Sequence, residues 1–223
     1  MNNKSININN QEFTYFVKRS KRAKYVQLRI NLDGEIELVI PKLVNYLTAE
    51  KFLFEKKDWL YKYFRFVNNK QNRYYYLGNI LSVIPENNLF SNNLKPTLFN
   101  NKLFLPLGNN RLSIKEHYNN WLKEEANKYI PKRVEFFSGK YGFSYNRITI
   151  KNQRTRWGSC SSKRNLSFNY RIMYFNSKVI DYIIIHELCH LKEMNHSKKF
   201  WNLVEEIMPD YKIYKQQLKS FFN

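Results

Sequence analysis

The sequence lacks several features that would assign it to a familiar class of protein. It has only two cysteines in 223 residues, Cys160 and Cys189, which are too few for a disulfide framework or a zinc knuckle of paired Cys-x-x-Cys motifs. It has no apolar run near the roughly 20 residues of a membrane span. Its N-terminal segment, MNNKSININNQEF, has no hydrophobic signal region. We therefore expect a soluble, reduced, cytoplasmic protein with no membrane partner.

Positive charge is abundant. The net charge is +20, a balance that often accompanies a polyanionic partner such as nucleic acid. The charge is nevertheless spread evenly, because residues 1–110 carry 17 Lys and Arg against 8 acids and residues 111–223 carry 21 against 10. Asn, Lys, Tyr, Phe and Ile are all overrepresented, as in proteins from AT-rich genomes. Contact between the basic surface and nucleic acid is one expectation, and a purely compositional origin of the charge is the other.

The first half of the chain predicts a β-rich N-terminal region over residues 1–110. Residues 25–30 and 36–40 alternate in hydrophobicity around Asp33-Gly34, which favours a β-hairpin. Thr48 is a candidate N-cap for a helix that runs to about Phe64. Two further hairpins are expected around Gly78-Asn79 and Asn100-Asn101.

The second half predicts a separate catalytic domain over residues 111–223. Ser113 and Glu116 have the spacing of a capping box, which begins a long helix that we expect to break from Gly139 onward. Strands are expected at residues 147–151, 155–160 and 166–172, followed by two helices. This order of elements is typical of an α+β fold rather than a doubly wound α/β fold.

Histidine is scarce, and three of the four histidines lie within IIIHELCHLKEMNHSKKFW, residues 183–201. His186 and His190 form an H-E-x-x-H motif, in which residues four apart lie on one face of a helix and bind the same cation. Glu187 lies beside the first ligand, where a general base takes a proton from water held by the metal. The motif predicts a zinc site with Glu187 as its catalytic residue.

The third ligand is expected to be His196. Its approach to the metal requires a turn after His190, and Asn195 is the candidate for a left-handed residue there. Three histidines leave one zinc position open, as in catalytic rather than structural sites. The alternative third ligands are Glu193, Glu205 and Glu206.

HELCHLKEMNHSKKFW, together with RTRWGSC at residues 154–160 and MPDYK at residues 208–212, resembles the YgjP-like metallopeptidase family, which is related to the SprT and WLM peptidases. The resemblance implies a zincin-like fold with a backing helix, a small sheet, the H-E-x-x-H helix and a C-terminal helix. It also implies zinc held by the three histidines and an RTRWGSC strand beside the cleft. Glu193 stands where metzincins have glycine, which argues against that group.

Within RTRWGSC, four residues are candidates for substrate binding. Trp157 is a candidate wall of the cleft, Gly158 allows close approach of the backbone, and Arg156 is a candidate for stabilising an oxyanion. The strand, including Ser159, is a candidate for pairing with an extended peptide.

Three functions are therefore weighed. The first is a zinc metallopeptidase that cleaves peptide or protein substrates. The second is a zinc hydrolase of a phosphorylated small molecule such as a nucleotide, suggested by Arg154, Arg156 and Arg171 but not by any phosphate-binding loop. The third is a peptidase that processes proteins associated with nucleic acid.

Overall fold

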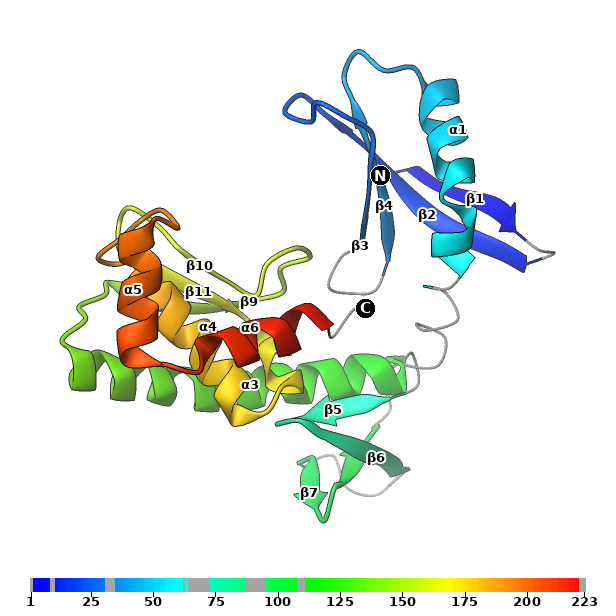
Figure 1. The fold of residues 1–223 in the computed structure, drawn as a ribbon. Coiled ribbons are helices and arrows are strands. Elements are labelled where there is room, and N and C mark those ends of the chain that lie inside the picture. Colours follow the sequence, from blue (N-terminus) through cyan, green and yellow to red (C-terminus); the bar gives the residue numbers. More distant parts are fainter. Residues whose placement is uncertain are drawn as a thin grey trace. The chain divides into compact units, whose positions relative to one another are not determined.

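The computed structural model describes residues 2–8, 11–30, 35–61, 63, 73–86, 95–107 and 111–220. The chain divides into two compact units, residues 1–72 and residues 73–221, whose elements are labelled in Figure 1. Among the residues described, no helix combines the length and the apolar character required to cross a membrane.

The first unit is a four-stranded sheet covered by a helix. Its strands are β1 (Asn2–Ile8), β2 (Gln11–Ser20), β3 (Gln27–Ile30) and β4 (Ile36–Pro41), in the order β1-β2-β4-β3, and α1 spans Tyr46–Glu55. The pair β3 and β4 is antiparallel, as the predicted hairpin requires, although its tip lies outside the described residues. Side chains from β2, β4 and α1 form a compact core of their own, which includes Phe13, Leu38, Ile40 and Leu53.

The predicted cap of α1 was wrong by three residues. The helix begins after Asn45, whose side-chain oxygen accepts a hydrogen bond from the Thr48 backbone N–H at 2.8 Å. Asn45 satisfies a free amide of the first turn as well as Thr48 would have done. The prediction of one continuous helix to about Phe64 was also wrong, because α1 ends at Glu55 with Lys56 as its C-cap.

The second unit begins with two hairpins, as predicted. They comprise β5 (Tyr74–Tyr76), β6 (Asn79–Glu86), β7 (Thr97–Phe99) and β8 (Lys102–Pro106), which form a sheet in the order β5-β6-β8-β7. The turn residues have positive φ in both, at Leu77-Gly78 (48° and 86°) and Asn100-Asn101 (47° and 59°). The first turn therefore lies one residue before the predicted Gly78-Asn79.

These hairpins belong to the second unit, whereas the sequence pattern placed the division after residue 110. The reason is a set of hydrogen bonds between the backbone of the first hairpin and distant residues of the second unit, which a local pattern does not reveal. The Leu77 N–H donates to the Met173 carbonyl at 2.8 Å, and the Gly78 N–H donates to the Tyr174 carbonyl at 3.2 Å. The Tyr118 hydroxyl donates to the Tyr75 carbonyl at 2.6 Å.

The backing helix α3 spans Ile114–Tyr141. Its capping box is present as predicted, with the Ser113 N–H donating to Glu116 at 2.8 Å and the Glu116 N–H donating to the Ser113 hydroxyl at 3.3 Å. The helix passes through Gly139 and ends at Tyr141, with a left-handed cap at Gly142 (φ of 66°), inside the segment from Gly139 to Tyr145 that was predicted to break it. A helix tolerates one glycine at a cost of about 1 kcal/mol.

A three-stranded sheet precedes the motif helix. It comprises β9 (Arg147–Lys151), β10 (Gly158–Cys160) and β11 (Asn165–Asn169), in the order β10-β11-β9. The predicted strand at 166–172 was wrong in its second half, which forms the 3-10 helix η1 (Tyr170–Tyr174). The Asn169 side chain caps η1 by accepting a hydrogen bond from the Arg171 N–H at 3.1 Å.

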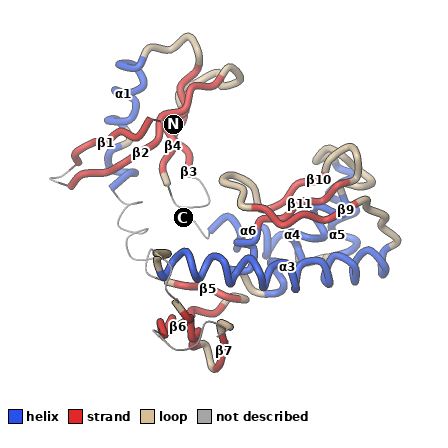
Figure 2. Tube along the Cα trace, turned by 180° about the vertical axis from the view of Figure 1, so that it is seen from behind, coloured by secondary structure: helices blue, strands red, loops and turns tan. Residues whose placement is uncertain are grey.

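Three helices complete the chain: α4 (Ser177–Cys189), α5 (Lys198–Ile207) and α6 (Tyr211–Ser220). The motif helix α4 contacts α3, β10, α5 and α6, and Figure 2 shows β9, β10 and β11 above it and α3 below. A bidentate ion pair between Arg133 and Asp181 joins α3 to α4 at 2.8 and 2.9 Å. This is the predicted α+β, zincin-like arrangement of backing helix, small sheet and motif helix, with α6 as an unpredicted addition.

Candidate metal centre

The first two histidines lie at the C-terminal end of α4. Asn176 caps this helix by accepting a hydrogen bond from the Val179 N–H at 3.0 Å. Almost every side chain of α4 is buried, which explains why its sequence is apolar on all sides. The helix ends at Cys189, with His190 as its C-cap. Cys189 is fully buried and belongs to the core rather than to the histidine cluster.

The structure brings the three predicted histidines together. One ring nitrogen from each of His186, His190 and His196 lies within 4.8 Å of the other two, and no glutamate belongs to this group among the described residues. The Nε2 atoms of His186 and His196 are 3.0 Å apart. Nitrogens that bind one tetrahedral zinc at about 2.0–2.1 Å are separated by about 3.3 Å, so the cluster has dimensions that suit such an ion.

The segment between His190 and His196 turns without a left-handed residue. The predicted positive φ at Asn195 was wrong, because Asn195 is not among the residues with φ above zero. Its side-chain oxygen instead accepts a hydrogen bond from the Ser197 N–H at 3.2 Å. Ser197 then caps α5 by accepting a hydrogen bond from the Phe200 N–H at 3.4 Å.

Hydrogen bonding and burial prepare the histidines for a metal. The Nδ1 of His190 lies 3.0 Å from the Glu193 carbonyl, so it acts as the donor and leaves Nε2 free for a cation. Burial, followed by the other two histidines and Lys215, lowers the pKa of His186 to about 3. Metal ligands must be neutral imidazoles, so this donor set fits zinc or a similar divalent ion.

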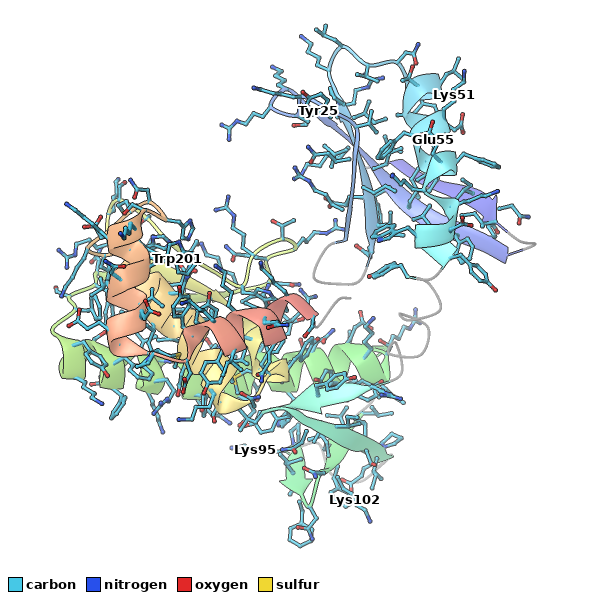
Figure 3. The ribbon with its side chains drawn as sticks, viewed as in Figure 1. Tyr25, Lys51, Glu55, Lys95, Lys102 and Trp201 are labelled. Carbon is cyan, nitrogen blue, oxygen red and sulfur yellow. The ribbon has the colours of Figure 1, made fainter. Side chains whose placement is uncertain are left out.

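Aromatic rings from α5 enclose the cluster. The Phe200 ring stacks on His190, with centroids 4.4 Å apart, and is fully buried. The half-buried Trp201, labelled in Figure 3, stacks on His196 with centroids 5.6 Å apart. Both rings limit the directions in which the histidine rings can turn.

Glu187 lies on a neighbouring face of α4 and is directed toward β10. Its side chain is buried, with 6% of the residue exposed. Burial raises the pKa of its carboxyl to about 8, opposed by the charge of Arg156 and by a hydrogen bond from the Cys160 backbone N–H. A carboxyl whose pKa lies near neutrality is well matched to proton transfer.

Gly158 explains how Glu187 fits against the strand. A Cβ added at Gly158 would lie 2.6 Å from the Glu187 Oε1 and 2.7 Å from its Cγ. These distances are below any ordinary contact, so every other residue at position 158 would displace the carboxyl. The structure thus gives a steric reason for glycine in the middle of RTRWGSC.

The neighbouring candidates have different surroundings. Trp157 is half-buried and packs edge-on against Phe175, with centroids 4.9 Å apart, while Arg156 is exposed. Ser159 lies in β10, opposite Ser167.

Two contributors to the site were missed in the sequence. The Cys160 backbone N–H has no signature in the sequence, because any residue type provides it. Lys215 lies on α6, which was not expected. The pair Tyr211 and Lys215, four residues apart, could have indicated one face of that helix.

Comparison with known proteins identifies the family. The model of the YgjP-like metallopeptidase domain matches residues 24–221, and no curated protein matches. The zymogen of Pyrococcus abyssi abylysin is 22% identical and aligns over 41% of this chain and 92% of its own, with a TM-score of 0.38. The zymogen of Methanocaldococcus jannaschii jannalysin is 25% identical and aligns over 42% and 97%, with a TM-score of 0.35. The match to the family model spans most of the sequence, and the chain belongs to the YgjP-like metallopeptidase family.

Proposed function

We propose that this metallopeptidase is a zinc enzyme of the H-E-x-x-H type that hydrolyses peptide bonds. One observation carries the proposal. Three histidine nitrogens lie within 4.8 Å of one another, and a buried carboxyl, Glu187, follows the first of them in α4. Three histidine ligands with a carboxyl base beside them are the donor set of a catalytic zinc site rather than a structural one.

In this proposal His186, His190 and His196 hold the metal. When bound, zinc supplies a Lewis acid that polarises the scissile carbonyl and brings the pKa of water close to 7. Glu187 takes the proton from the attacking water and delivers it to the departing amine. Its burial keeps the proton in the site, and the Cys160 N–H fixes the orientation of the carboxylate.

The substrate is proposed to lie along β10. This strand is at the edge of its sheet, paired on one side with β11, and an edge strand offers backbone groups to an extended peptide. Ser159 and the backbone of Gly158 belong to that edge. Arg156, whose charge reaches Glu187, is proposed to stabilise the oxyanion that forms during attack, and Trp157 to form part of the cleft wall.

A phosphorylated small molecule is less well supported as the substrate. Arg171, one of the three arginines that suggested it, is only 5% exposed. Its guanidinium donates to the Asn152 side chain at 2.8 Å and packs over the Tyr170 ring. The Arg171 side chain is therefore held by contacts within the core of the unit.

A nucleic-acid-associated role is supported by one feature of the first unit. Five of the seven residues from Lys18 to Lys24 are basic, and no acid occurs between Glu12 and Asp33. Tyr25, labelled in Figure 3, follows this segment and is 75% exposed, and exposed aromatic rings beside basic groups suit single-stranded nucleic acid. This role requires an affinity for DNA that falls steeply as salt is raised, and a flat salt dependence would exclude it.

The peptidase proposal is tested with Glu187→Gln, which keeps the shape of the side chain and removes the base. Zinc-loaded protein should cleave casein or a peptide panel, and the variant should retain its zinc while kcat falls on the order of 10³-fold. Glu135→Gln, an exposed position on α3, serves as the matched control and should keep full activity. Equal activity in wild type and Glu187→Gln would refute the proposal.

A further inference from the structure

An ammonium group lies beside the metal centre, separated from it by one aromatic ring. The Lys215 Nζ is 3.7 Å from the centroid of the Trp201 ring. Trp201 in turn stacks on His196 at 5.6 Å and lies 5.9 Å from the His186 ring. Lys215 is therefore part of the surroundings of the site, although it is 19 residues beyond the last histidine in the sequence.

Packing holds this lysine in place. Tyr211, one helical turn before it in α6, is buried and stacks on Trp201 at 5.5 Å and on Tyr182 of α4 at 6.4 Å. Residues four apart share one face of a helix, so the contacts of Tyr211 direct Lys215 toward the same ring. The position of the ammonium thus follows from the packing of α6 against α4 and α5.

No acidic side chain among the described residues pairs with Lys215. Lys212, on the same helix, forms an ion pair with Glu205 at 3.1 Å. Lys215 forms no ion pair within the described part of the chain, and Lys219 adds a second positive charge nearby. Partial burial of an unpaired cation costs free energy, and its contact with the Trp201 face offsets only part of that cost.

An unpaired, half-buried cation at the edge of a proposed peptidase site suits an anionic group of the substrate. The anions that peptides carry are carboxylates, either of Asp and Glu side chains or of the C-terminus. Extended peptide covers about 3.3 Å per residue. Two or three residues therefore cover the distance from the histidines across one ring to the ammonium.

We propose that Lys215 binds a substrate carboxylate, so that the enzyme selects peptides that carry a carboxylate within two or three residues of the scissile bond. The inference rests on the proposed peptidase function and adds a substrate class to it. Lys215 is a specificity residue in this account, since it does not touch the reacting atoms. A purely structural lysine on Trp201 would affect all peptides equally.

The test compares zinc-loaded full-length wild type with Lys215→Met, Lys215→Arg and Lys219→Met. A neutral peptide cleaved by the wild type is resynthesised with Asp or Glu at successive positions, and each version is made with a free or an amidated C-terminus. Comparison of the two ends distinguishes a side-chain carboxylate from the terminal one. Zinc content and thermal midpoint are measured for each variant.

We expect wild type to prefer carboxylate-bearing peptides by at least about tenfold in kcat/KM, the effect of about 1.4 kcal/mol. Lys215→Met should abolish the preference by raising KM for those peptides, with kcat and KM for neutral peptides unchanged. Lys215→Arg should restore most of the preference, because it restores the positive charge. Lys219→Met should keep the preference, because Lys215 is the lysine that lies over the Trp201 ring.

Three outcomes would overturn the inference. A wild type without preference, or a Lys215→Met variant with the preference intact, refutes carboxylate binding while peptidase activity stands. Equal loss on neutral and acidic peptides in both Lys215→Met and Lys215→Arg assigns the lysine a structural role. Failure of the wild type to cleave any peptide rejects the peptidase proposal, and the carboxylate site with it.

Discussion

The two units of this chain resemble each other in construction and differ in what they bury. Each contains a four-stranded sheet with one parallel pair between two antiparallel pairs. In the first unit, Glu37 is the one buried polar side chain among the described residues. The second unit buries seven: Ser138, Ser167, Asn169, Arg171, Asp181, Glu187 and His190.

This difference indicates where the chain accepts a cost in stability for function. A buried polar group is unfavourable unless it is hydrogen-bonded or paired. In the second unit Asp181 and Asn169 have such partners. Among the described residues, three buried polar atoms have no hydrogen-bond partner, the Ser138 hydroxyl, the Gln153 amide oxygen and the His186 Nδ1, and the last of these lies in the histidine cluster. Incomplete satisfaction concentrates at functional sites. The first unit carries almost none of this burden, and we therefore expect the histidine site to keep its metal when the first unit is destabilised.

The largest effect is expected from a cavity in the core of each unit. Leu38 in β4 and Leu122 in α3 are both fully buried, so Leu→Ala at either should cost about 3 kcal/mol. We expect Leu38→Ala to increase hydrogen exchange only in residues of the first unit and to leave zinc content unchanged. Leu122→Ala should instead lower the temperature at which zinc is released. Zinc loss in Leu38→Ala would mean that the units are not separable.

A slightly smaller effect is expected at the ion pair between α3 and α4. Arg133→Met leaves Asp181 buried without its partner and should cost about 2 kcal/mol, below the range for fully buried pairs because Arg133 is 30% exposed. Lys212→Met removes an exposed pair with Glu205 and should cause no measurable change. Chemical denaturation followed by tryptophan fluorescence compares the two. Equal changes in the free energy of unfolding would show that the buried pair contributes no more to stability than the exposed pair.

Two glycines of the second unit provide a sharper contrast. Gly158→Ala should lower kcat/KM at least about tenfold, because the new methyl group displaces Glu187. Gly139→Ala has no atom within 4 Å of the new Cβ, and in a helix it should stabilise by about 0.5–1 kcal/mol with activity unchanged. Activity assays and thermal midpoints are measured for both variants. Full activity in Gly158→Ala would contradict the geometry described for Glu187.

The smallest expected effect concerns helix caps in the two units. Asn45 caps α1 and Asn176 caps α4, and replacement of either by Ala should cost about 1 kcal/mol. Only Asn176→Ala should also weaken zinc binding, since α4 carries two ligands. Competition with a zinc-binding dye measures that difference, and equal zinc affinity in both variants would contradict it.

The sequence predicted what local chemistry determines. The capping box at Ser113 and the turn at Asn100-Asn101 were both found. Each depends on residues no more than three positions apart. The histidine cluster was predictable for a similar reason, because the helical spacing of His186 and His190 leaves few other uses for them.

The errors arose where distant contacts override a local preference. The second half of the 166–172 segment belongs to η1, whose Met173 and Tyr174 carbonyls accept hydrogen bonds from Leu77 and Gly78 of a distant hairpin. Lys215 reaches the histidines only through the packing of α6, which depends on Tyr182 and Trp201.

The central claim is that His186, His190 and His196 together hold a catalytic zinc ion. Elemental analysis of the purified full-length protein, beside His196→Ala and the control His117→Ala, tests it most directly. The account predicts one zinc per chain in wild type and in His117→Ala, and a loss of most of the metal in His196→Ala. A wild type that binds no zinc, or a His196→Ala variant that retains all of it, would contradict the account.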